Sequence, residues 1–235
     1  MAYSTYSDTA VAGVMEDERA GFIRRTYAHL AGAIAAFAML EVYLLKSPLA
    51  VEMIRFISRN QFGWLMVLGA FILVGWMARG LASKVQSKAM QYAGLALYTV
   101  AEAVIFIPIL YLAVNYSEPS VLSNALLLTG AMFGGLTFIA FTTRKDFSFL
   151  RGILSIGGFV ALGLIAGGVA FGFDLGLAFS VGMIALASGS ILYDTSKIIH
   201  HYSQDQYVAA ALELFASVAL LFWYVLRILM RFSRR

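Results

Sequence analysis

The chain has no cysteine, only three prolines and few charged residues, which make up 13% of its 235 positions. Without cysteine there is no disulfide, no thiolate metal site and no cysteine nucleophile. A soluble domain has about 25% charged and about 45–50% apolar residues, whereas 61% of this chain is hydrophobic. The composition therefore excludes an ordinary soluble domain and indicates a membrane protein.

Long hydrophobic runs fill the chain instead. Seven of them are each close to the ~20 residues that an α-helix needs to cross a ~30 Å hydrocarbon layer. Continuous runs of this length exclude β-barrel strands, which alternate over about 10 residues. The predicted spans are Thr26–Leu45, Phe62–Leu81, Gln91–Val114, Val121–Thr142, Arg151–Phe171, Leu175–Ile199 and Tyr207–Leu229. We therefore predict an all-α membrane protein with seven transmembrane helices. Residues 1–25 form a short polar N-terminal tail, in which residues 1–18 are expected to be disordered. Residues 26–229 form the transmembrane domain and residues 230–235 a basic C-terminal tail.

Lysine and arginine are shared unevenly between the two sides of the predicted membrane domain. The connections on the side of the N-terminus are the richer, which favours a cytoplasmic N-terminus. Seven spans then place the C-terminus outside, although the basic residues Arg227, Arg231, Arg234 and Arg235 oppose this. The alternative is that one of the seven spans is re-entrant. No basic stripe interleaved with aromatic residues lies outside the spans, so we expect membrane lipids and no nucleic acid as partners.

Carboxylates within the spans are the main candidates for function. An ionisable group at the centre of a membrane helix costs roughly 2.5–3.5 kcal/mol, so it is a functional candidate by default. Helix order places Asp194 near the inner end of the sixth span and Glu213 about 9 Å into the seventh, at a rise of 1.5 Å per residue. Two acids at one depth on adjacent helices would share a proton, sense pH, or bind a hard cation such as Ca²⁺. In the alternative interpretation, Asp194 pairs locally with Lys197 and Glu213 meets headgroups or an arginine.

Glu102 lies near the middle of the third span. We expect it to face the interior and to pair with a polar group, in either a functional or a structural role.

Two enzyme or cofactor classes with seven or more membrane helices are excluded because the residues they require are absent. A retinal protein needs a lysine in the seventh span, where none occurs. An intramembrane aspartyl protease needs a second acid in a G-x-G-D context, and Asp174 in F-G-F-D lies at the opposite membrane face. We predict neither an enzyme nor a cofactor.

Two segments carry a resemblance to a known family. T-T-R-K-D-F-S-F-L at residues 142–150 and I-L-Y-D-T-S-K-I-I-H at residues 191–200 resemble the signature loop and the sixth helix of the Bax-inhibitor-one family. Within it the chain is most similar to the bacterial branch that modulates the membrane protease FtsH. The resemblance implies seven helices with a central seventh helix.

The resemblance also implies a property known for some members of the family, a pH-sensitive calcium leak gated by two aspartates. The first maps onto Asp194 and the second onto Ser217, so the chain departs from the pattern there. Glu213, one helical turn earlier, lies on the same face and is a candidate replacement. We therefore expect a multi-pass protein of the bacterial cytoplasmic (inner) membrane that binds and modulates an FtsH-type protease. The alternative is a pH-sensitive calcium or cation leak channel, with Ca²⁺ as the permeant or bound ion and its metal ligands unknown.

Overall fold

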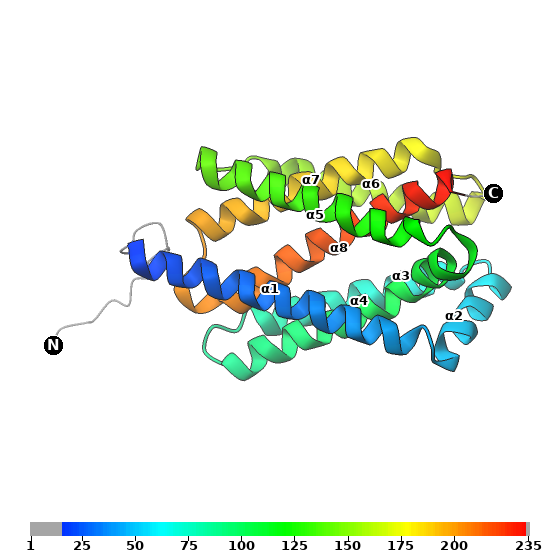
Figure 1. The fold of residues 1–235 in the computed structure, drawn as a ribbon, viewed down its shortest axis with the longest axis horizontal. Coiled ribbons are helices and arrows are strands. Elements are labelled where there is room, and N and C mark those ends of the chain that lie inside the picture. The colour runs from blue at the N-terminus through cyan, green and yellow to red at the C-terminus, as the bar shows by residue number, and fades with distance from the viewer. Residues whose placement is uncertain (1–15, 234–235) are drawn as a thin grey trace.

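The fold is a bundle of long α-helices, seen in a computed structural model that describes residues 16–233 (Figure 1). The elements are α1 (Glu16–Leu44), α2 (Pro48–Arg59), α3 (Gly63–Ala82), α4 (Lys88–Tyr116), α5 (Ser120–Thr143), α6 (Leu150–Phe171), α7 (Gly176–His200), the 3-10 turn η2 (Gln204–Gln206) and α8 (Tyr207–Phe232). Within residues 16–233, seven helices are long and apolar enough to cross a membrane. The predicted fold class is confirmed.

Successive long helices run antiparallel, so the bundle has two ends (Figure 1). We call the end where α1 begins the amino end and the end where α8 stops the carboxyl end. The helices α4, α6 and α8 also begin at the amino end, whereas α3, α5 and α7 finish there. Residues far apart in the sequence, such as Arg79 on α3 and Lys197 on α7, are therefore brought to the same end.

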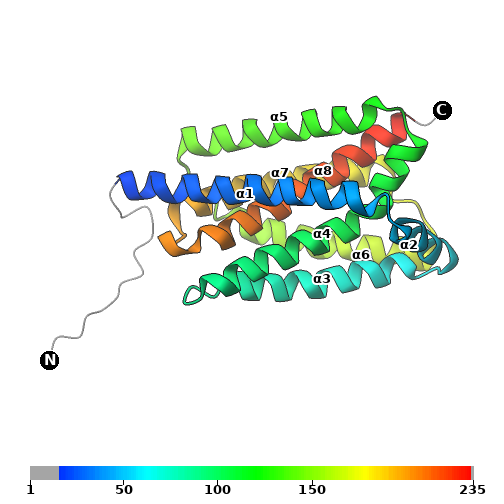
Figure 2. The ribbon, with the colours of Figure 1, turned by 60° about the horizontal axis from the view of Figure 1, so that its bottom comes forward.

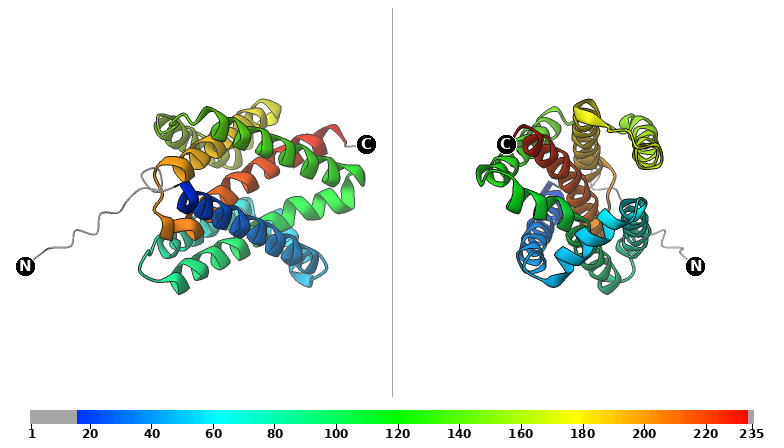
Figure 3. Two further views of the ribbon diagram at one scale, coloured as in Figure 1. Left: turned by 60° about the vertical axis from the view of Figure 1, so that its left-hand side comes forward. Right: turned by 90° about the vertical axis from the view of Figure 1, so that its right-hand side faces the viewer.

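Helix α8, the seventh span, is the central helix of the bundle. It packs against α1, α3, α4, α5 and α7, and the end-on view in Figure 3 shows it among them. Its run of buried small residues, Ala209, Ala210 and Ala211, lets neighbouring backbones approach closely. The large side chains of Leu214 and Leu221 are fully buried. The predicted central seventh helix is confirmed.

The first connection contains a helix that the hydropathy of the sequence did not predict. With 12 residues, α2 is too short to cross a membrane, and it lies at the carboxyl end beyond the long helices (Figure 2). Pro48 begins it, as suits a first helical position, where the missing N–H has no partner to lose. Ala50 and Met53 are buried on one face, whereas Arg55 and Arg59 are exposed.

The first long helix begins ten residues earlier than the predicted first span. Phe22 and Thr26 are already buried against the bundle, so packing rather than hydropathy extends α1 toward Glu16. The last part of the predicted N-terminal tail is thus helical. The predicted disorder of the tail concerns mainly residues 1–15, and these, like residues 234–235 of the predicted C-terminal tail, lie outside the described residues.

Candidate functional site

A cavity of about 1540 Å³ lies within the bundle, lined by α3, α4, α6, α7 and α8. All four candidate residues of the sequence analysis line it: Asp194, Glu213, Glu102 and Ser217. They come from three helices, and the antiparallel arrangement brings them to the half of the cavity nearer the amino end. The structure therefore gathers the predicted residues around one space.

Asp194 is held by the central helix. Its side chain is 7% exposed, and the Ser217 hydroxyl of α8 donates a hydrogen bond to its Oδ2 atom at 2.6 Å. Because few water molecules reach such a position, this single donor is worth more than it would be at the surface. Ser217, the position at which the sequence departs from the two-aspartate pattern, thus faces Asp194 directly.

Glu213 has a different partner, the ammonium group of Lys197 on α7. The Lys197 Nζ and Glu213 Oε2 atoms are 2.5 Å apart, and their side chains are 23% and 33% exposed. The same ammonium lies over the rings of Tyr193 and Tyr202, 5.4 and 4.9 Å from their centroids. Glu213 is therefore neutralised locally by a cation that several groups hold in place.

The structure gives each of the two acids its own partner. Across residues 16–233, no hydrogen bond joins Asp194 to Glu213, although the two charges are close enough to interact. Lys197 takes Glu213 as its ion-pair partner and not Asp194, its neighbour on α7. Helix order predicts the shared depth of the acids, but it leaves the rotation of α7 relative to α8 undetermined. That rotation decides which side chain pairs with each acid.

Glu102 lies deep in the bundle at 5% exposure. The Tyr98 hydroxyl and the Arg79 guanidinium are the polar groups that act on it, and its Oε2 atom has no hydrogen-bond partner. Arg79 lies 3.5 Å from the Tyr98 hydroxyl and over its ring, 5.2 Å from the centroid. Sequence reasoning missed Arg79 and Tyr98. The sequence did contain a signal for Arg79, because a basic residue inside the last turn of an apolar span is unusual.

The two segments that carry the family resemblance contact each other. Ser196 of α7 accepts a hydrogen bond from the Phe147 N–H at 2.9 Å. Within the loop, Asp146 Oδ1 accepts hydrogen bonds from the hydroxyl and the N–H of Ser148, at 2.5 and 2.9 Å. These donors, with a smaller contribution from the nearby His201, lower the pKa of the Asp146 carboxyl. The loop is thereby fixed to the C-terminal part of α7, at the amino end of the bundle and close to Asp194.

The chemistry available at this site is that of protons and charges. Among residues 16–233, no group of three or more His, Asp or Glu side chains is placed to hold a metal ion. Ca²⁺ takes six to eight oxygen ligands, and the Lys197 ammonium already occupies Glu213. The arrangement can bind or release a proton at Asp194 or Glu102, next to the fixed positive charges of Arg79 and Lys197.

The fold and this site define a class: a multi-pass helical membrane protein that keeps ionisable groups around an internal cavity. The sequence profile of the family described as "Inhibitor of apoptosis-promoting Bax1" matches residues 19–234. The chain therefore belongs to this family, the Bax-inhibitor-one family, and the resemblance stated above is confirmed.

Three relatives show how far the similarity extends. An uncharacterized protein of Pseudomonas aeruginosa is 40% identical over 110 residues, 46% of this chain and 49% of its own length. The modulator of FtsH protease YccA of Escherichia coli is 37% identical over 123 residues, 52% of this chain and 56% of its own. Bax inhibitor 1 of Schizosaccharomyces pombe is 25% identical over 97% of this chain and 88% of its own. The chain thus spans about half the length of the two bacterial relatives.

Proposed function

We propose that this chain is a protein of the bacterial cytoplasmic (inner) membrane, with its N-terminus in the cytoplasm, that binds an FtsH-type membrane protease and modulates its activity. The observation that carries the proposal is the similarity to the E. coli protein, which is described as a modulator of FtsH protease. A modulator acts by contact and needs no catalytic group of its own, which suits a chain whose polar site offers proton and charge chemistry only.

The lipid-facing side of α5 supports a binding role. Leu127 and Phe138 are each 70% exposed on the outer surface of the bundle. A Cβ added at Gly130 or Gly134 would meet no atom within 4 Å. Membrane helices associate through close packing over small residues, so this face can accept a transmembrane helix of a partner. We infer that the protease binds along α5.

The test is reconstitution of the full chain with an FtsH-type protease, ATP and a membrane-protein substrate in liposomes. We expect the chain to change the rate of substrate degradation. Gly134→Leu should reduce this effect, because a bulky side chain there keeps a partner helix away. Gly69→Leu is the matched control, since Gly69 on α3 also has no atom within 4 Å of a Cβ. An unchanged degradation rate with the wild-type chain would refute the proposed function, and equal effects of the two variants would remove α5 as the contact.

A pH-sensitive cation leak is the second candidate, favoured by the buried acids that line the cavity. Two features weigh against it. Ser217 stands where the second aspartate of the pattern would be, and Lys197 neutralises Glu213. Calcium entry into liposomes between pH 5 and pH 8 tests it directly. If the leak exists, Asp194→Asn abolishes its pH dependence, whereas wild-type liposomes that leak no more than empty ones exclude the channel.

A further inference from the structure

We propose that the cavity binds one anionic phospholipid, whose headgroup is held by Arg227 and Arg231 and one of whose two acyl chains lies along the apolar middle of the cavity, between α3 and α6. This binding site is separate from the acid site at the amino end, and the inference does not depend on the protease.

The size of the cavity suits a lipid. Its volume of about 1540 Å³ exceeds the roughly 300–1,000 Å³ of pockets for drug-sized ligands. It extends along α3 from Trp64 to Arg79, a length of about 22 Å at 1.5 Å per residue. One leaflet contributes about half of a ~30 Å hydrocarbon layer, so the cavity is long enough for an acyl chain. Its middle is apolar, lined by Leu68, Phe71, Ile105, Leu162, Met183 and Leu220.

The cavity opens sideways toward the membrane. Ile72 on α3 and Phe159 on α6 both line it, yet they are 44% and 77% exposed. Helix α6 packs on α7, and α3 packs on α4 and, less extensively, on α8, so α3 and α6 form the two edges of an opening. The end-on view in Figure 3 shows both helices on the same side of α8. An acyl chain can therefore enter directly from the bilayer.

The headgroup position follows from charge. Arg227 and Arg231 line the carboxyl end of the cavity, four residues apart on one face of α8. Arg231 lies 3.7 Å from Asp174, but both side chains are more than half exposed, and such surface pairs contribute little. Arg227 forms no ion pair with a carboxylate of the described residues. These three side chains leave a net positive charge at this mouth, which complements a phosphate.

The opposite end of the cavity lacks this excess. There Lys197 is paired with Glu213, and Arg79 faces Glu102 and Asp194. Arg79, Arg151 and Lys197 at this end are balanced by Glu102, Asp194 and Glu213, so the lining here carries no net charge.

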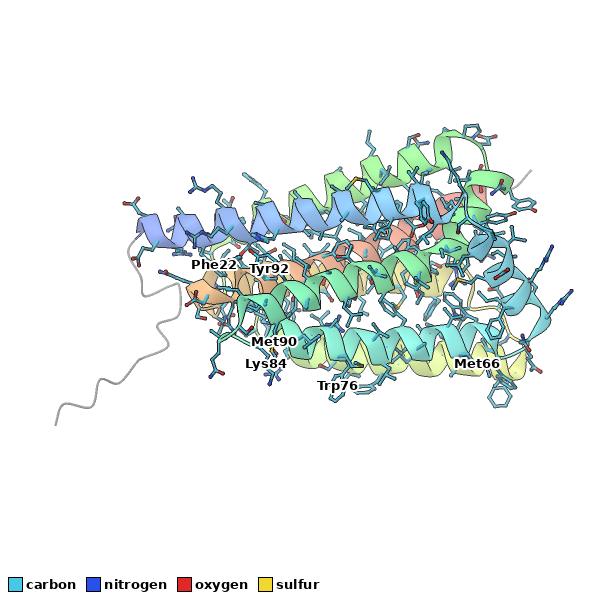
Figure 4. All side chains as sticks on the ribbon, turned by 90° about the horizontal axis from the view of Figure 1, so that it is seen from below. Phe22, Met66, Trp76, Lys84, Met90 and Tyr92 are labelled. Carbon is cyan, nitrogen blue, oxygen red and sulfur yellow. The ribbon has the colours of Figure 1, made fainter. Side chains whose placement is uncertain are left out.

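Tryptophan fluorescence provides the test, because two of the three tryptophans line the cavity and the third does not. Trp64 and Trp223 line the cavity and stack on each other with centroids 5.6 Å apart. Trp76 is 74% exposed and points away from the bundle (Figure 4). In the Trp76→Phe background, brominated acyl chains quench emission only when they reach the cavity region. The full chain is reconstituted in zwitterionic lipid with a small fixed fraction of brominated phosphatidylglycerol or brominated phosphatidylcholine.

We expect stronger quenching by the brominated phosphatidylglycerol. Replacing Arg227 and Arg231 by Gln should lower the preference about fivefold for each arginine removed. Arg151→Gln, at the other end of the same cavity, is the matched control and should leave the preference unchanged. The double Arg→Lys variant keeps the charge and should keep most of the preference, which separates loss of charge from misfolding.

Three results would overturn the proposal. Equal quenching by the two lipids in the wild-type chain would mean that the cavity does not select an anionic headgroup. A preference that survives the double Gln variant would mean that other groups hold the headgroup. A preference lost in Arg151→Gln but kept in the double Gln variant would place the headgroup at the amino end.

Discussion

The partner of Lys197 can be determined by a double-mutant cycle, and the structure predicts its outcome. Lys197 can pair with Glu213 on α8 or with Asp194 on its own helix, and the structure places its ammonium 2.5 Å from Glu213. Removing one member of a buried ion pair costs about 3–5 kcal/mol, whereas exposed pairs contribute about 0.2–1 kcal/mol. Because these side chains are 23% and 33% exposed, we expect a coupling energy between these limits, about 1–3 kcal/mol.

The variants are Lys197→Gln, Glu213→Gln and the double variant, measured by reversible unfolding of the purified chain in mixed micelles. The double variant should be less destabilised than the sum of the two single ones, because neither charge is left alone in it. A parallel cycle of Lys197→Gln with Asp194→Asn is the control. We expect its coupling to be smaller, since Asp194 takes its hydrogen bond from Ser217.

A larger coupling in the Asp194 cycle than in the Glu213 cycle would refute the assignment of partners. It would also return Glu213 to the role of a free acid and strengthen the leak interpretation. Coupling of about zero in both cycles would show that the ion pair contributes no stability, which would contradict the expectation drawn from its burial.

Three further predictions concern packing, pH and topology. A Cβ at Gly94 would lie 2.5 Å from the Ala78 carbonyl oxygen, so Gly94→Ala should lower the free energy of unfolding by about 1–3 kcal/mol in the same assay. Gly134→Ala is the control and should cost nothing. Similar values for both would contradict the close approach of α3 and α4. Ser148 lowers the pKa of Asp146 in the folded state, so the stability that this carboxylate provides is present above the unfolded pKa and is lost as pH falls through the folded one. The difference in unfolding free energy between wild type and Asp146→Asn should therefore shrink below about pH 4, and a constant difference would exclude the effect. A topology reporter fused after Arg235 should read as external, and cytoplasmic activity would contradict the proposed orientation.

The seven spans could be predicted from hydropathy because each one must satisfy the same physical requirement, an apolar length that matches the bilayer. Helix α2 could not be found in this way, since it is short and amphipathic rather than apolar throughout. Its spacing did contain a signal: Ala50, Met53 and Ile57 recur with helical periodicity. The central position of α8 came from the family resemblance and not from the periodicity of the sequence.

The sequence predicts how deep in the membrane the candidate residues lie, but not which side chains they contact. Helix order was enough to place Asp194 and Glu213 at one level, because the connection between their helices is short. The choice of Ser217 and Lys197 as their respective partners depends on how α7 and α8 are rotated about their axes, and packing against five neighbours sets that rotation. Tyr98 lies one turn before Glu102 on α4, a spacing that helical periodicity already places on one face. Arg79 acts on Glu102 from a different helix, α3, and no local pattern in the sequence encodes that approach.

The central helix is also the last of the seven spans to leave the ribosome. Until α8 is synthesised, Glu102 and Asp194 have no central helix to shield them, and Asp194 lacks the Ser217 hydroxyl. Buried polar groups without partners are costly in lipid, so the nascent chain passes through a stage in which six inserted helices cannot yet close around a core. Quality control by membrane proteases would act most strongly during that interval. A chain interrupted before Tyr207 should be cleared rapidly, even though it retains six of its seven membrane spans.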